Sequence, residues 1–578
     1  MDISDKHLVI SEGKKVSSKM SILIFLNITI NSIASSMLAT SLTTALPPIM
    51  KDLNISVNTG QWLTSGFILC LAVMTPFTAY LITRFRTKPL YFVAVGFFIA
   101  GLIICALSHN FYLMMAGRII QGAGNGLLSS IGQVIILTIF PKEKIGTMMG
   151  WYGLSFGVAP IIAPTVAGLL VDSIGWRMIF YIAVGIMIIS LIWAICIFDD
   201  VLPLMDKHFD FISFFLSIFT FGGITLAISN VGTADFISYE VLIPLCVSIV
   251  AGLIFFPRQL KVKVPFLDIR VLKNKNYTIS AIATIVLQFT IMGSAIVVPV
   301  YVQQIKGHSA TISGLVLLPG SLAMAITSPL AGRFYDKVGI KPLIILGPIL
   351  LCLSNLAVYF ITIHQSVWIY SLINIVRCVS IAILLMPLVT WSMIEIPKTK
   401  TSDATALYNS LRAVSGAIGS ACYISIMTKV AKAVKNKKES PEMYGVNVVF
   451  LIMAIFSFIV FLIGVFACSN TKSPSKKAKD IQDDGKIESP MEKKIDNNDN
   501  DIETVEIDIK DINDKKKDND IKSNAGSEFS TIIEGVSDEI STDTIPESDI
   551  TSKDIVENNS KTDNNSEIKV VVDNDKKN

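Results

Sequence analysis

Charged residues are scarce in this chain of 578 residues: only 16% of it is Asp, Glu, Lys or Arg, and 52% is hydrophobic. The mean hydropathy of +0.59 lies far outside the range of soluble globular proteins. Acidic residues are also missing from the middle of every long apolar run. This composition indicates a multi-pass membrane protein rather than a soluble one.

The usual signatures of enzymes and metal sites are missing too. No GxxxxGK[ST] loop is present, so the chain is not expected to hydrolyse nucleotides. None of the eight cysteines has the paired spacing of a zinc site, and no nucleophile–base arrangement is visible. We expect no enzymatic activity, metal, cofactor, nucleotide or nucleic acid. The expected partners are a small-molecule substrate and the lipid bilayer, and no accessory export subunit can be identified.

What the sequence has in abundance is apolar runs. Fourteen of them are long enough to cross a bilayer, which takes about 17–25 residues. They lie near residues 20–46, 61–83, 89–108, 111–139, 145–171, 177–198, 212–231, 240–256, 276–302, 311–334, 341–362, 367–395, 404–430 and 445–468. An even number of spans places both termini on one side. Lys and Arg are more frequent in the loops of that side, so we expect both termini in the cytoplasm.

The runs form two related halves. Arg118 and Arg377 lie at corresponding places 259 residues apart, and Tyr152 and Tyr408 are related by a similar offset of 256. Internal repeats of this kind are typical of secondary transporters. We therefore expect an all-α membrane protein with six-helix bundles at 20–200 and 276–468, and two inserted helices with their linkers at 201–275.

The two ends of the chain differ from this pattern. Residues 1–19 are polar and are expected to form a cytoplasmic segment. From residue 469 on, Asp, Asn, Lys, Ser and Glu dominate, and Phe529 is the only aromatic residue. Such a segment buries too little apolar surface to offset its ordering entropy. We expect residues 469–578 to be a disordered cytoplasmic tail.

Polar residues inside the first and fourth runs are candidates for a substrate or coupling site. An arginine at membrane depth costs about 2.5–3.5 kcal/mol on insertion scales, so Arg118 must face protein or a watery cavity. It is either a fixed positive charge beside the transport path or a structural arginine bonded to carbonyls. Gln121 and Asn125 share its helix face. Asn27 and Asn31 line one face of the first run, either as cavity lining or as interhelical hydrogen-bonding groups.

The fifth run combines Tyr152 with Gly157, Pro160, Pro164 and Gly168. Prolines four residues apart bend a helix and remove backbone hydrogen bonds at one place. Small residues at three- or four-residue spacing let helices approach closely. A bent helix beside the charged fourth run is predicted to line a transport path; a helix that is only tilted is the alternative.

The C-terminal half supplies a second set of candidates. Gly332, Arg333, Asp336 and Gly339 lie at the end of the tenth run. There, Arg333 and Asp336 are expected to form an ion pair that closes a cytoplasmic gate. The remaining polar candidates of this half are Arg377, Asn409 and Arg412, and we interpret the two arginines as gating or packing charges.

Several motifs occur in the order known from one family. They are Arg118-x-x-Gln121-Gly122-x-Gly124, Ala159-Pro160-x-x-Ala163-Pro164, and Ser328-Pro329-Leu330-Ala331-Gly332-Arg333-x-x-Asp336-x-x-Gly339. Over residues 20–468 the chain resembles the major facilitator superfamily, specifically its fourteen-helix drug–proton antiporters of EmrB/QacA type. The resemblance implies the major facilitator fold. It also implies multidrug efflux of amphipathic cationic or neutral compounds across the plasma membrane, by alternating access and driven by proton antiport.

Two departures from the family pattern leave alternatives open. Leu38 occupies the position in the first run where the family usually carries an acid, and the loop after the second run lacks its usual acid and glycines. One alternative is a major-facilitator transporter of another small solute without proton coupling. The other is a non-transporting membrane receptor that signals through its tail.

Overall fold

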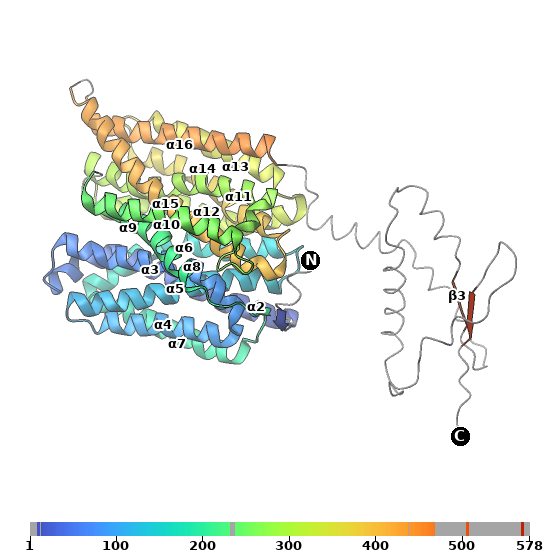
Figure 1. Cartoon of the computed structure of the whole chain (residues 1–578). Helices are drawn as coiled ribbons and strands as arrows, with labels where there is room; N and C mark the ends of the chain where they lie inside the picture. Colours follow the sequence, from blue (N-terminus) through green and yellow to red (C-terminus); the bar gives the residue numbers. More distant parts are fainter. Residues whose placement is uncertain are drawn as a thin grey trace. The chain divides into compact units, whose positions relative to one another are not determined.

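The computed structural model describes residues 9–11, 13–14, 16–231, 237–436, 439–468, 504–507 and 568–571. These residues form two units, residues 1–487 and 488–578, which we describe separately. The first unit holds all the helices, and Figure 1 shows them running side by side.

Fourteen long helices follow one another, as predicted. Among the described residues, thirteen spans are long and apolar enough to cross a membrane; α6 is a further long helix. The N-terminal six are α2 (Ser18–Asp52), α3 (Val57–Arg84), α4 (Thr87–Ala106), α5 (Phe111–Ile139), α6 (Ile145–Ser173) and α7 (Arg177–Ile197). The C-terminal six are α11 (Lys275–Pro299, extended by the π-helix η3, Val300–Ile305), α12 (Ala310–Val338), α13 (Lys341–Tyr359), α14 (Val367–Met393), α15 (Thr401–Ala433) and α16 (Pro441–Phe466).

Between these sets lie the two inserted helices. The first is interrupted: α8 (Phe211–Ser217) and α9 (Gly223–Asn230) are joined by a π-helical turn, η1 (Ile218–Gly222), which the apolar pattern did not predict. The second is α10 (Tyr239–Lys261). Short 3-10 helices, η2 (Ile269–Lys273) and η4 (Lys398–Lys400), precede α11 and α15.

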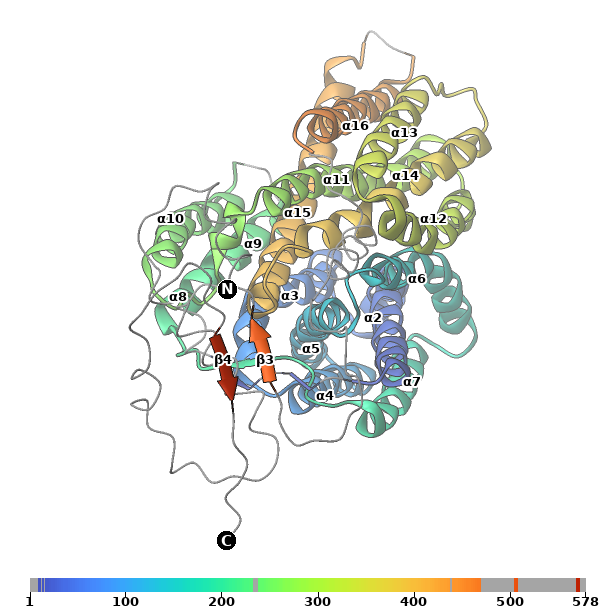
Figure 2. The ribbon, with the colours of Figure 1, turned by 90° about the vertical axis from the view of Figure 1, so that its right-hand side faces the viewer.

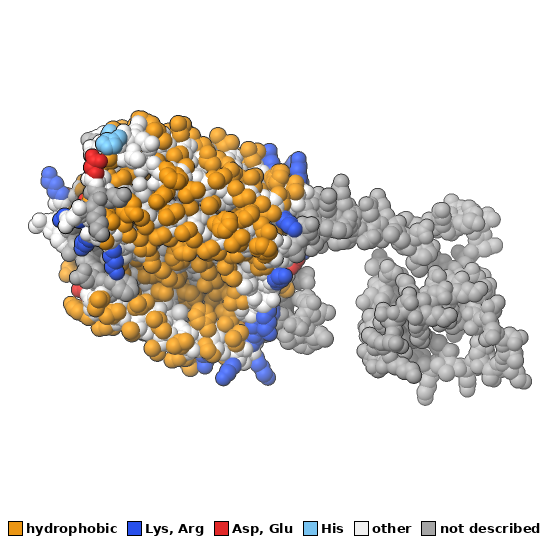
Figure 3. Space-filling model, turned by 90° about the horizontal axis from the view of Figure 1, so that it is seen from above, with side chains coloured by type: hydrophobic (Ala, Val, Ile, Leu, Met, Phe, Trp, Pro, Cys, Tyr) orange, Lys and Arg blue, Asp and Glu red, His pale blue; other side chains and the backbone are white. Residues whose placement is uncertain are grey.

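The helices begin where the sequence supplies caps and expose apolar side chains along their length. The side chains of Ser17, Ser56, Asn110 and Ser309 each accept a hydrogen bond from a backbone N–H in the first turn of the helix that follows. Leu169, Ile189 and Leu253 are about two-thirds exposed or more (67%, 69% and 71%). Figure 3 shows apolar side chains covering one face of the helical unit, with Lys and Arg gathered at its two ends. This pattern is that of a lipid-facing surface.

The twelve helices other than the inserted pair separate into an N bundle (α2–α7) and a C bundle (α11–α16). Figure 2 shows the bundles viewed along the helices. The bundles meet through α6 against α12 and α14, and through α15 against α3 and α5. The inserted pair packs against α3 and α15. We call the end of the unit where α2 begins and α16 ends the termini end; it is the right-hand end in Figure 1.

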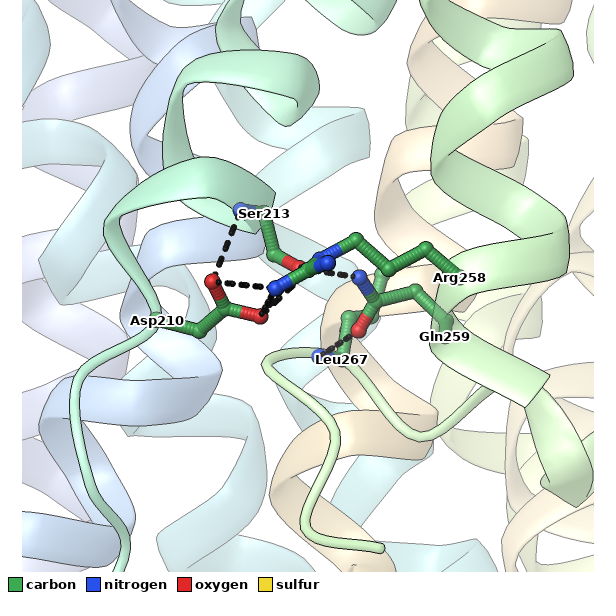
Figure 4. Close-up of polar contacts among 5 residues, drawn as sticks. All are labelled: Asp210, Ser213, Arg258, Gln259 and Leu267. Carbon is green, nitrogen blue, oxygen red and sulfur yellow. Dashed lines mark hydrogen bonds and ion pairs between the residues drawn. The ribbon is translucent and has the colours of Figure 1, made fainter. Parts of the chain in front are cut away.

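A polar network ties the inserted helices together at the termini end, as Figure 4 shows. Asp210 caps α8, and Arg258 of α10 donates hydrogen bonds to both of its carboxylate oxygens at 3.1 Å. The Gln259 amide donates to Ser213 Oγ at 2.7 Å and accepts from the Leu267 N–H at 3.2 Å. The inserted pair is therefore fixed to the linker that leads into the C bundle.

The predicted cytoplasmic N-terminal segment is docked on the N bundle. Its strand β1 (Val9–Ser11) pairs antiparallel with β2 (Leu204–Met205) in the linker after α7. Lys14 forms an ion pair with Asp199 of the same linker at 2.8 Å. The first residues and the linker are thus held together at the termini end.

In the second unit, the described residues form two short strands, β3 (Thr504–Ile507) and β4 (Ile568–Val571), which pair antiparallel. The rest of the predicted tail lies outside the described residues. A tail without stable structure therefore stays a prediction.

Candidate functional site

A hydrogen-bonded cluster fills the N bundle near α2. The Asn27 amide donates to the backbone oxygen and to Oγ of Ser190, both at 2.9 Å, and its Oδ1 accepts from the Tyr91 hydroxyl at 2.8 Å. Asn31 donates to the same Tyr91 hydroxyl. Asn27 is fully buried and Asn31 nearly so. Asn27 therefore forms hydrogen bonds between helices, which is the second of the two roles expected for it from the sequence.

Asn31 lies at the edge of a small cavity of about 20 Å³. Its walls include Ser32 and Ser35 of α2 and Asn125 and Ser129 of α5. Ser35 donates to Asn125 Oδ1 at 2.6 Å, whereas Oδ1 of Asn31 is buried without a hydrogen-bond partner. The cavity is large enough for one water-sized polar group.

Arg118 and Arg377 each form hydrogen bonds between helices of their own bundle. Arg118 donates to the Leu63 carbonyl of α3 at 3.0 Å and to Gln121, and its guanidinium stacks on Phe67 at 4.2 Å. Arg377 donates to Asn355 Oδ1 at 3.1 Å and to the Thr290 carbonyl at 3.0 Å. Both are buried and held by neutral oxygens. This geometry fits the structural alternative for Arg118, with the carbonyl coming from α3, and a role of Arg118 in transport stays a prediction.

The fifth predicted segment forms one continuous helix, α6, through both prolines. The side chains of Pro160 and Pro164, and the surroundings of Gly157, lie outside the described part of the structure, so the predicted bend stays a prediction. A Cβ added at Gly168 would meet nothing within 4 Å. Gly168 is therefore not a close-packing position.

The close packing of α6 lies nearer the termini end, where it meets α12. A Cβ at Gly150 would lie 2.6 Å from the Ser328 carbonyl oxygen, and one at Gly332 would lie 2.9 Å from the Gly146 carbonyl carbon. Ser328 Oγ donates to the Gly150 carbonyl at 2.9 Å. Glycine at these positions lets the two backbones touch, so the bundles close on each other here.

Asp336 reinforces this contact, but with a different partner from the one predicted. Its Oδ1 accepts from the Gly146 N–H at 2.9 Å, and its Oδ2 accepts from the N–H and Oγ1 of Thr147 at 2.7 and 2.6 Å. Arg333 is exposed. The predicted Arg333–Asp336 ion pair was wrong, because the free N–H groups at the start of α6 bind the carboxylate instead. Gly339 ends α12 with a φ of 91°.

A second contact at the termini end was not predicted from the sequence. Lys207, in the linker after α7, forms an ion pair with Asp403 at the start of α15 at 2.8 Å, and both side chains are buried (6% and 2% exposed). The signal available was a single loop lysine and an acid near a segment end. Nothing in their spacing indicated that they would meet.

Between these contacts and the middle of the unit, Asn409 and Arg412 of α15 face the N bundle. The Asn409 amide donates to Gln133 Oε1 of α5 at 2.9 Å. One turn further along α15, Arg412 is partly exposed and interacts electrostatically with Tyr408 and with Tyr152 of α6. Tyr152 in turn is hydrogen bonded with Ser32, which lines the cavity. Tyr152 and Arg412 are therefore brought together across the seam between the bundles.

The hydrogen bonds between the two bundles described above lie in the half nearer the termini end. The linker ion pair lies at the same end. Within residues 16–231 and 237–468, with their short gaps, no group of His, Cys, Asp and Glu is placed to hold a metal ion. The polar contacts described between the bundles are therefore gathered near the termini end.

Comparison with known proteins gives consistent results. The model of the Major Facilitator Superfamily matches residues 24–420. The uncharacterized MFS-type transporter YcnB of Bacillus subtilis is 35% identical over 440 residues, covering 76% of this chain and 93% of that protein. The lincomycin resistance protein LmrB of Bacillus subtilis is 32% identical, covering 75% and 92%. The multidrug export protein EmrB of Haemophilus influenzae is 26% identical, covering 65% and 74%.

Among solved structures, the human organic anion transporter MFSD10 superposes with a TM-score of 0.56. The match covers 77% of this chain and 99% of that one, at 13% sequence identity. At this identity the likeness concerns the fold alone.

Proposed function

Because this chain belongs to the major facilitator superfamily, we propose that it exports amphipathic, drug-like compounds from the cell by alternating access. The chain is a carrier and not an enzyme. Its relatives include proteins named for lincomycin resistance and multidrug export. The observation that carries the proposal is the group of polar contacts between the bundles near the termini end, since an alternating-access carrier must close one end of its path while the other is open.

The proposal includes an orientation. The lysine- and arginine-rich loops favour a cytoplasmic termini end, in the plasma membrane. The state in which these contacts are formed is then the outward-facing one, with the α6–α12 contact and the Lys207–Asp403 pair as the cytoplasmic gate. Substrate enters from the cytoplasm after these contacts open, and leaves when they close again.

Proton antiport is the proposed energy source. Across the described helices, the carboxylates that lie deepest are Asp336 and Asp403, each two residues inside a helix end. Both hold the gate shut as hydrogen-bonded or ion-paired groups. Protonation of either from the cytoplasm would weaken its contact, so proton binding and gate opening would be coupled.

A second candidate is a carrier of the same fold without proton coupling. It is favoured by Leu38, which is buried and apolar (4% exposed) at the position where the family usually has an acid. In proteoliposomes holding the purified chain, collapsing the proton gradient with an ionophore separates the two. Antiport predicts that concentrative uptake stops, and the second candidate predicts an unchanged rate.

Export itself is tested by locking the gate. Thr147→Cys and Asp336→Cys are combined in a protein whose native cysteines are replaced, and a short bifunctional thiol reagent bridges them. Transport should fall to background and return after reduction, whereas each single variant should be insensitive to the reagent. Undiminished transport in the bridged protein would rule out alternating access through this contact.

A susceptibility panel in an antibiotic-sensitive bacterial host would define the substrates. It should include lincomycin because of the LmrB relatives. Expression of the chain should raise the tolerated concentration of at least some amphipathic compounds. The bridged variant provides the matched inactive control.

A further inference from the structure

An N-terminal strap, consisting of residues 9–11, 13 and 14, lies along the linker that follows α7. Backbone pairing and one ion pair hold it there. The facing residues are Val9 and Met205, Ser11 and Leu204, and Lys14 with Asp199 and Asp200. The Lys14 N–H donates to the Asp200 carbonyl at 2.9 Å. The strap therefore contacts the linker at both ends of the stretch from residue 199 to residue 205.

Gly13 brings the strap against the backbone of the linker. A Cβ added at this position would collide with the carbonyl oxygen of Val201 and would lie 2.6 Å from its carbonyl carbon. Both atoms belong to the backbone, which does not move aside as the end of a flexible side chain does. Glycine is therefore the residue that allows this close approach while the strap is docked.

The linker is also bonded to the start of α4. The Leu202 N–H donates to Thr87 Oγ1 at 3.1 Å, and the Lys88 N–H donates to Asp200 Oδ1 at 3.0 Å. The linker thus has two sets of contacts within the N-terminal half of the chain, one with α4 and one with the strap. Together they fix its path toward Lys207.

Lys207 is directly connected to the strand pair that the strap forms. Its N–H donates to the Met205 carbonyl at 3.0 Å, and Met205 is the residue opposite Val9. Its ammonium group pairs with Asp403 of α15 at 2.8 Å, and both side chains are buried. Forming such a pair costs the conformational entropy of the segment that carries the lysine. A linker that is already ordered lowers this cost.

We propose that the N-terminal strap is a latch for the gate at the termini end: by ordering the linker it positions Lys207 for Asp403, and so favours the state in which the gate contacts are formed. The inference rests on the proposed function, because these contacts are the gate of the proposed carrier. It goes beyond that function by giving the segment before the first helix a regulatory role. Release of the strap makes the gate easier to open.

Gate opening is measured in the full chain, with its native cysteines replaced, as the initial rate at which a membrane-impermeant maleimide labels Ser328→Cys. Gly13→Val should force the strap off the linker, and Lys14→Asp should repel Asp199. We expect the first variant to raise the labelling rate about fivefold to thirtyfold, the effect of ordering about one residue. The second should raise it by up to about fivefold, the range of one exposed ion pair.

Matched controls separate release of the strap from general damage. Gly185→Val adds the same side chain at a position in α7 where a Cβ meets nothing within 4 Å. Lys19→Asp reverses an exposed charge at the start of α2. Neither should change the labelling rate. Lys14→Asp combined with Asp199→Lys rebuilds the ion pair with its charges exchanged and should restore most of the wild-type rate.

The decisive measurement removes the charges that the strap is proposed to bring together. In a background with Lys207→Met and Asp403→Leu, Gly13→Val should leave the labelling rate unchanged, because no ion pair depends on the order of the linker. A rise as large as that in the wild type would mean that the strap does not act through Lys207, and would overturn the inference. So would an unchanged rate for Gly13→Val in both backgrounds. Size-exclusion profiles establish that each variant is folded.

Failure of the proposed function gives a different result. Gly332→Val, whose side chain would meet the backbone of Gly146 and Gly150, should raise the labelling of Ser328→Cys whether or not the strap acts. If it does so while Gly13→Val does not, the latch is overturned and the gate stands. If Gly332→Val leaves labelling unchanged and no compound in the susceptibility panel is tolerated better, the gate and export both fail, and the latch fails with them.

Discussion

The two contacts that close the termini end are related by the internal repeat, yet they are built differently. At the α6–α12 contact, Asp336 at the end of α12 binds the free N–H groups at the start of α6. The corresponding residue at the end of α3 is Thr83, which bonds back to Ala79 and Tyr80 of its own helix. The start of α15 is instead held by its own acid, Asp403, through the linker residue Lys207.

The two contacts therefore do not share one motif. The end of α3 has no acid, and the contact beside it is made instead by Asp403 of the opposing helix and Lys207 of the linker. The first contact holds two helices directly. The second also holds the linker, which is itself anchored by Lys14–Asp199 and Arg84–Asp206.

The sharpest way to break the first contact is Gly332→Val. The new side chain would meet the backbone of Gly146 and Gly150, which cannot move aside, so the gate cannot close. We expect transport to fall by about tenfold or more, equivalent to about 1.4 kcal/mol or more on the closed state. Gly314→Val on the same helix is the control, because a Cβ there meets nothing within 4 Å. Equal transport in the two variants would contradict the closed α6–α12 contact.

The second contact is tested by a double-mutant cycle. Asp403→Leu leaves the Lys207 charge buried and unpaired, which costs about 3–5 kcal/mol. Lys207→Met combined with Asp403→Leu should recover most of that loss. Thermal unfolding in detergent, with two-state behaviour established first, measures the coupling. Additive single effects would mean that the two charges do not interact.

A smaller effect distinguishes the observed partner of Asp336 from the one expected from the sequence. Asp336→Asn removes the negative charge beside the α6 N-terminus and should cost the closed state about 1–3 kcal/mol. Arg333→Gln should have no effect, because Arg333 is exposed. Labelling of Ser328→Cys by a membrane-impermeant maleimide reports gate opening, since Ser328 is buried in the closed contact. Faster labelling in the Arg333→Gln variant would instead support the Arg333–Asp336 ion pair predicted from the sequence.

The smallest effect concerns the inserted helices. Partial burial tends to raise the pKa of Asp210, but hydrogen bonds from Ser213 and Arg258 prevail and lower it below its ordinary value. Its contribution to stability is therefore present above the unfolded pKa, about 3.9, and is lost as pH falls through the lower folded value. Arg258→Gln should destabilise by about 1 kcal/mol or less at pH 5–8, and the difference from the wild type should shrink below about pH 4. Gate labelling should not change.

The helices were predictable because the thickness of the bilayer's hydrocarbon core sets the length of a membrane-spanning helix. Residues 111–139 were expected to form one helix, and α5 spans Phe111–Ile139. The turn at Ile218–Gly222 was not, since a π-helix leaves the apolar pattern unchanged. The family and its two-bundle fold followed from motif order and repeat spacing, and both are confirmed.

Pairings between distant residues were harder to predict. Asp336 was expected at this end of α12, but its partners are two backbone N–H groups and the Thr147 hydroxyl, and backbone donors, which almost every residue carries, are not revealed by a side-chain pattern. Lys207 and Asp403 are 196 residues apart. Their meeting depends on how the linker folds back, which single-residue patterns do not encode. Arg118 and Arg377 were placed correctly in their helices, but only coordinates show that neutral oxygens hold them.

The pairing of β1 with β2 has a consequence for biosynthesis. Strand β1 is completed at Ser11, but its partner, Leu204–Met205, leaves the ribosome only after six helices have been made. The earliest residues must therefore wait, unpaired, while the first bundle enters the membrane. Strand β1 can therefore pair only after this bundle has been made, when the linker that carries Lys207 is also present to contact the second half.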